Sequence, residues 1–130
     1  MQAVITDIDP FDLPEWLGTS EVVWQADEGL RAGHHVRGRL TSEGHDDLVC
    51  DLLAVDEAYP EPVVDDATRL RVHQAWRHGQ VVIGETGSRL VLAVPGTHFG
   101  PEGVLDVLGR LARAVGAHTE RYAALLRLGR

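Results

Sequence analysis

The segment from Pro101 to Gly116 constrains the fold more than any other part of the chain. Its apolar residues recur at helical spacing and form a face that covers about half of the circumference; they are Val104, Leu105, Val107, Leu108, Leu111, Ala112 and Val115. Proline suits the first turn of a helix and glycine its end, so the two flanking residues mark its boundaries. Such a wide apolar face must be buried, and we predict a helix over 101–115 that packs on a sheet.

Several segments have the composition and alternation of β-strands. Strand-forming residues are concentrated in 21–26, 34–41, 48–55, 80–85 and 89–94, the last two around a turn at Gly87. The 48–55 segment is apolar on both faces except at Asp51, which is typical of a central strand. The tail, 119–128, fits a strand or a helix. We favour a strand, which would join the sheet after a helical crossover and run parallel to one neighbour.

A second helix is predicted over 66–78, because Asp65 or Asp66 can cap its start and Gly79 can end it. These elements predict an α+β fold, in which a single, mainly antiparallel β-sheet of about five to six strands packs against two main helices, 66–78 and 101–115. Residues 1–10 have no clear period and are expected to form a flexible N-terminal arm. The remaining residues, 11–130, are expected to form a single α+β domain.

The charge balance excludes several classes of function. All 12 basic residues are arginine, against 20 acidic residues, and the formal net charge is -8. Without lysine the chain has no Schiff-base lysine and no P-loop lysine. The acidic balance argues against nonspecific binding to nucleic acid or to an anionic membrane, so neither is expected as a partner. The arginine-only set reflects either codon bias or selection for planar recognition of carboxylate or phosphate, and both explanations stay open.

Neither a metal site nor a cofactor is predicted. The single cysteine, Cys50, excludes an internal disulfide and a multi-cysteine metal site. His34 and His35 come near His45 if their strands form a hairpin, but adjacent residues on a strand point to opposite faces. The N-terminus has no signal-peptide pattern and no apolar run has the length of a membrane span, so we expect a cytoplasmic protein.

Polar and aromatic residues are concentrated where the 48–55 strand leads into the 66–78 helix. Loops held by rigid elements commonly carry binding residues, and tyrosine, tryptophan and arginine are enriched at the centres of interfaces. We therefore expect a binding site made of Asp56, Glu57, Tyr59, Arg69, His73, Trp76 and Arg77. In the structural alternative, Asp65 and Asp66 only cap the helix and Tyr59 only anchors the loop.

Two functions are compatible with this pattern. No complete catalytic motif occurs, so no catalytic residue is predicted and the question of enzymatic activity stays open. The first hypothesis is a non-catalytic binding or regulatory module that acts as a homodimer, with a protein as a further partner, because Leu70 has no obvious role in the core. The alternative is a small-molecule enzyme or ligand-binding protein with a polar pocket at the 56–62 loop and the 66–78 helix. In this alternative, Asp56 or Glu57 acts as a base and His73 acts as an acid or a base.

The blocks Leu13–Gly18, Leu52–Pro60, His73–Gly79 and Leu92–Thr97 resemble those of a small family of uncharacterised actinobacterial proteins. The resemblance covers most of the chain and implies a cytoplasmic bacterial protein. That family has no known activity, so it implies no site residue. The order of the predicted elements is also similar to that of small secretion-chaperone-like α+β domains. This second likeness involves no shared motif, and a fold by itself does not fix function.

Overall fold

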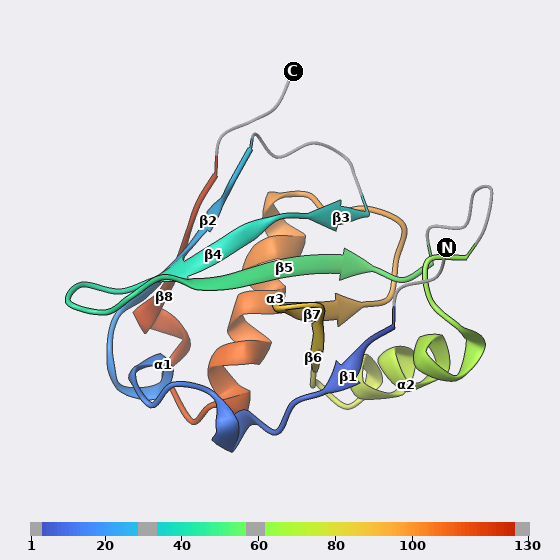
Figure 1. Ribbon diagram of the computed structural model, residues 1–130, viewed down its shortest axis with the longest axis horizontal. Coiled ribbons are helices and arrows are strands. Elements are labelled where there is room, and N and C mark those ends of the chain that lie inside the picture. The colour runs from blue at the N-terminus through green and yellow to red at the C-terminus, as the bar shows by residue number, and fades with distance from the viewer. Residues whose placement is uncertain (1–3, 29–33, 57–61, 127–130) are drawn as a thin grey trace.

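The computed structural model describes residues 4–28, 34–56 and 62–126 (Figure 1). Within these ranges one mixed, mostly antiparallel sheet contains eight strands. They are β1 (Thr6–Asp7), β2 (Val22–Ala26), β3 (His35–Val36), β4 (Gly38–Thr41), β5 (Leu48–Ala54), β6 (Val82–Thr86), β7 (Arg89–Val94) and β8 (Tyr122–Leu125). Their order is β1-β6-β7-β5-β4-β2-β8, and β3 pairs with β5. The sequence-based number of about five to six strands is therefore too low.

Both predicted main helices are present. They are α2 (Asp66–Arg77) and α3 (Pro101–Ala114), and the shorter elements are α1 (Trp16–Thr19) and the 3-10 turns η1 (Pro10–Asp12) and η2 (Thr119–Arg121). Asp65 caps α2, because its side chain accepts a hydrogen bond from the backbone N–H of Thr68 at 3.2 Å. The α+β class, the excess of antiparallel pairs and the two main helices are thus confirmed.

The helices cover the two faces of the sheet, and β5 lies between them. Leu52 belongs to the larger core, in which α3 contributes Val104, Leu108 and Leu111. The neighbouring Leu53 belongs to the smaller core beneath α2. Among the described strands, two pairs run parallel, β5 beside β7 and β2 beside β8. The central position of β5 and a parallel strand in the 119–128 tail are both confirmed.

One of the extra strands arises from a break in a predicted strand. The predicted 34–41 strand is interrupted at Arg37, so that β3 and β4 pair separately with β5. Beside this break the backbone N–H of Gly38 donates to the Asp51 carboxylate at 3.2 Å, and the Cys50 carbonyl accepts from the Trp24 indole at 2.9 Å. The Asp51 and Trp24 side chains therefore form hydrogen bonds with backbone groups that would pair with a neighbouring strand if the strand were continuous.

The N-terminal segment contributes one further strand. Thr6 and Asp7, which fall within the predicted arm, pair antiparallel with Glu85 and Gly84 of β6. This pairing places Asp7 next to α2, where it meets Arg71.

No helix in the described part of the chain is long and apolar enough to cross a membrane.

Candidate functional site

Asp56 lies at the carboxyl end of the parallel strands β5 and β7. It follows β5 by two residues, and Gly96 follows β7 by two residues, so the parallel pairing brings them together. The backbone N–H of Asp56 donates to the Gly96 carbonyl at 2.8 Å. In return the N–H of Gly96 donates to Oδ2 of the Asp56 carboxylate at 3.0 Å. Polar groups at this edge of parallel strands are well placed to meet a ligand or a partner.

Helix α2 adds two side chains to this carboxylate. Arg69 and His73 are four residues apart, so they lie on one side of the helix. Nε of Arg69 donates to Oδ1 of Asp56 at 2.7 Å, and Nε2 of His73 lies 2.9 Å from Oδ2. We call Asp56, Arg69, His73 and Gly96 the Asp56 cluster. It joins α2 to the ends of β5 and β7, and its side chains remain partly exposed.

The hydrogen bonds of the cluster set the charge state of Asp56. Burial of the carboxylate acts to raise its pKa, but hydrogen bonds from His73, Gly96 and Arg69 outweigh burial and hold the pKa below its ordinary value. The carboxylate is therefore ionised at neutral pH and is a poor proton acceptor. Its chemistry is that of an anchor for cationic groups.

Replacing Asp56 with alanine is expected to lower the free energy of unfolding by about 1–2 kcal/mol at neutral pH. Because the folded-state pKa is lowered, this contribution is fully present above the unfolded-state pKa and is lost as the pH falls through the folded-state pKa. Urea unfolding at several pH values should show the cost of the variant shrinking in acid. Asp46→Ala, at an exposed position in the connection between β4 and β5, is the control. A cost that stays the same from neutral to strongly acid pH would contradict this assignment.

The other predicted site residues lie in different surroundings. The Trp76 ring is half-buried, and the guanidinium carbon of Arg110 lies 3.3 Å from the ring centroid. Arg110 also donates to the Trp76 carbonyl at 2.7 Å. Arg77 is exposed on the last turn of α2. Glu57 and Tyr59 lie outside the described residues. The structure thus groups Asp56, Arg69 and His73, and joins Trp76 to α3.

Sequence reasoning missed the partners that complete these contacts. Gly96 belongs to a different strand connection, and Arg110 is 34 residues from Trp76 along the chain. A local signal existed for one buried group: Asp51 was the only polar residue in an otherwise apolar strand. Its side chain is completely buried and binds Arg89, His35 and the Gly38 amide. Its closed environment indicates a structural role.

No group of three or more histidine, cysteine, aspartate or glutamate side chains in the described part could hold a metal ion. Comparisons with family models, with curated proteins and with solved structures found no match to this chain. The function is therefore argued from the geometry of the surface and its charges.

Proposed function

We propose that this chain is a non-catalytic binding module that acts as a homodimer and uses the outer side of α2, next to the Asp56 cluster, as its interface. The main support is the full engagement of the Asp56 carboxylate by Arg69, His73 and the Gly96 amide. A carboxylate held in this way does not act as a base, but it fixes α2 and its side chains in place. Groups that are already ordered lose little conformational freedom when a partner binds.

The outer side of α2 is complementary to a second copy of itself. Asp66, Leu70, His73 and Arg77 are spaced i, i+4, i+7 and i+11, which places them in one stripe along the helix. Leu70 is 59% exposed near the middle of this α2 stripe. An antiparallel copy related by a two-fold axis would set Asp66 of one protomer opposite Arg77 of the other, with the two Leu70 side chains in contact.

The test is the oligomeric state of the Leu70→Glu variant. We expect the wild-type chain to sediment as a dimer and the variant as a monomer, because the substitution places like charges together at the two-fold axis. Leu105→Glu is the matched control, since Leu105 is 53% exposed on α3 and outside the stripe. A wild-type monomer at every concentration, or equal effects of the two variants, would refute the proposed interface.

One observation favours the enzyme or ligand-binding alternative. His73 is held by the Asp56 carboxylate through Nε2, an arrangement that orients an imidazole for proton transfer through its other nitrogen. In that alternative His73 acts on a polar or cationic metabolite. Thermal unfolding with a panel of such metabolites separates the two proposals. Stabilisation that is lost in His73→Gln but kept in Leu70→Glu would support the alternative, and no stabilisation by any compound would support the binding module.

A further inference from the structure

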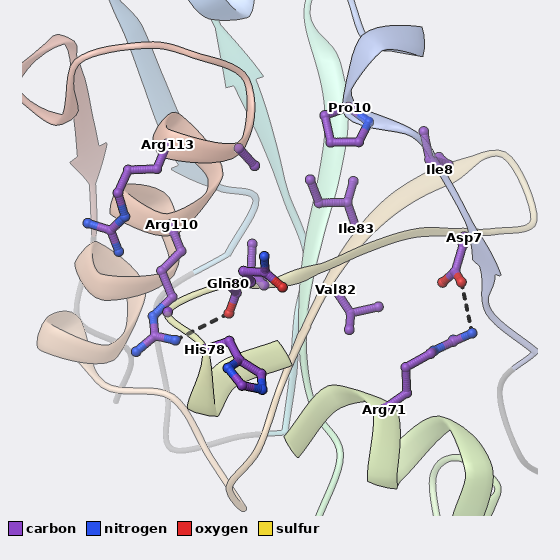
Figure 2. A pocket seen from close by; sticks show the side chains of 13 residues that line it. Asp7, Ile8, Pro10, Arg71, His78, Gln80, Val82, Ile83, Arg110 and Arg113 are labelled. Atoms are coloured by element: carbon purple, nitrogen blue, oxygen red, sulfur yellow. Dashed lines mark hydrogen bonds and ion pairs between the residues drawn. The ribbon is translucent and has the colours of Figure 1, made fainter. Parts of the chain in front are cut away.

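A groove lies between the C-terminal ends of α2 and α3 and the N-terminal segment that carries β1. Its volume is about 810 Å³, within the usual range for small-molecule sites. Figure 2 shows Val82 and Ile83 of β6 inside it, with Ile8 and Pro10 on the N-terminal side. The groove therefore has room for a small organic molecule, and its apolar lining is partly exposed at Ile8 and Pro10.

Basic side chains surround this apolar surface. Arg71, His78, Arg110 and Arg113 line the groove, and Asp7 is the acidic residue among the lining residues. In Figure 2, Arg110 and Arg113 extend from α3 on one side, while Arg71 extends from α2 on the other side of Val82. A chain with a formal net charge of -8 thus has a local excess of positive charge here. Such a concave cationic surface attracts anions.

The arginines differ in how far their donors are used. Nη1 of Arg71 donates to Oδ2 of Asp7 at 2.8 Å, but its Nε is buried and has no acceptor within the described residues. Arg110 is fixed by the carbonyls of Trp76 and Gln80. Among the described carboxylates, none forms an ion pair with Arg113. Arg113 is exposed and therefore keeps its donors available, while Arg71 is paired with Asp7 and Arg110 holds the wall of the groove in place.

We propose that this groove binds a small organic anion. Arg113 holds its carboxylate or phosphate group, Arg71 adds positive charge from the other side of the groove, and the partly exposed Ile8 and Pro10 contact its apolar body. Planar guanidinium groups bind both kinds of oxyanion well, which the arginine-only composition of the chain also suits. The inference is independent of the proposed dimer, because Arg71 lies outside the α2 stripe.

Calorimetric titration of the full chain with four defined probes tests the charge and the apolar body separately. Phenyl phosphate and 4-phenylbutyrate carry both features, 4-phenylbutanol lacks the charge, and inorganic phosphate lacks the apolar body. We expect at least one of the first two to bind about tenfold more tightly than the last two. Whichever of phenyl phosphate and 4-phenylbutyrate binds more tightly shows whether the groove prefers a phosphate or a carboxylate group. Equal affinity for 4-phenylbutanol, or no binding of either aromatic anion, would overturn the proposal.

Two charge-matched variants locate the site. Arg113→Gln is expected to weaken binding of the preferred anion about tenfold, because it removes a charged hydrogen-bond donor. Arg37→Gln removes the same charge from an exposed position outside the groove and should leave the affinity unchanged. Unfolding curves for both variants check the fold. Equal losses in the two variants would mean that only the net charge attracts the anion, and the groove would not be its site.

Discussion

Replacing Asp51 with alanine is expected to lower the free energy of unfolding by about 3–5 kcal/mol. The Asp51 carboxylate is completely buried and accepts two hydrogen bonds from Arg89, from Nε and from Nη2, each at 2.7 Å. The Arg89 side chain is 26% exposed, so alanine would leave a partly buried guanidinium without its main acceptor. The Gly38 amide would lose its acceptor as well, and this is the amide beside the break between β3 and β4.

Urea denaturation at neutral pH measures this cost directly. Asp47→Ala is the control, because it breaks an exposed pair in which Oδ2 of Asp47 lies 3.5 Å from Nε of Arg39. Exposed pairs of this kind contribute less than about 1 kcal/mol. If Asp51→Ala costs no more than Asp47→Ala, the buried network does not stabilise the sheet and our account of β3, β4 and β5 is wrong.

Gly38→Ala is expected to cost about 3 kcal/mol, because a methyl group has no room there. A Cβ at Gly38 would lie 2.6 Å from the Gln25 carbonyl oxygen and would overlap the Trp24 ring. Trp24 has little freedom to move away, since it is completely buried and its indole N–H donates to the Cys50 carbonyl at 2.9 Å.

Gly103→Ala is the matched control for this substitution. Its new Cβ would lie 4.0 Å from the Phe99 ring, an ordinary contact, and alanine favours the helical conformation of α3. We expect this variant to be slightly more stable than the wild type. Thermal unfolding of both variants provides the comparison. A Gly38→Ala variant as stable as Gly103→Ala would show that Trp24 and β2 can shift to accommodate the methyl group.

The parts of the fold that were predictable are those with a strong periodic pattern. The apolar face of the 101–115 segment was sufficient to predict α3, and the apolar faces of the 48–55 segment were sufficient to place β5 at the centre. The strands β1 and β3 have two residues each, which is too short for any period to be visible. The break at Arg37 depends on Asp51 and Trp24, which are distant in sequence, so no local pattern could indicate it.

The sites on the surface can also be divided into those that the sequence could predict and those that it could not. Asp56 follows a clear strand and Arg69 and His73 share one side of a clear helix, so their proximity could be expected from the order of the elements. The groove combines an N-terminal strand with the ends of α2 and α3. Asp7 and Arg71 are separated by 64 positions, and no motif connects them. A site of this kind becomes visible only when the tertiary structure is known.

Disulfide formation by Leu70→Cys tests the proposed dimer most directly. Burial raises the pKa of the Cys50 thiol far above its usual value, so the introduced cysteine is the reactive thiol of the chain. A two-fold axis at Leu70 predicts that mild oxidation of dilute protein converts Leu70→Cys to a covalent dimer, while Leu105→Cys stays monomeric. Equal or absent cross-linking of the two variants would contradict the proposal that this chain associates through α2.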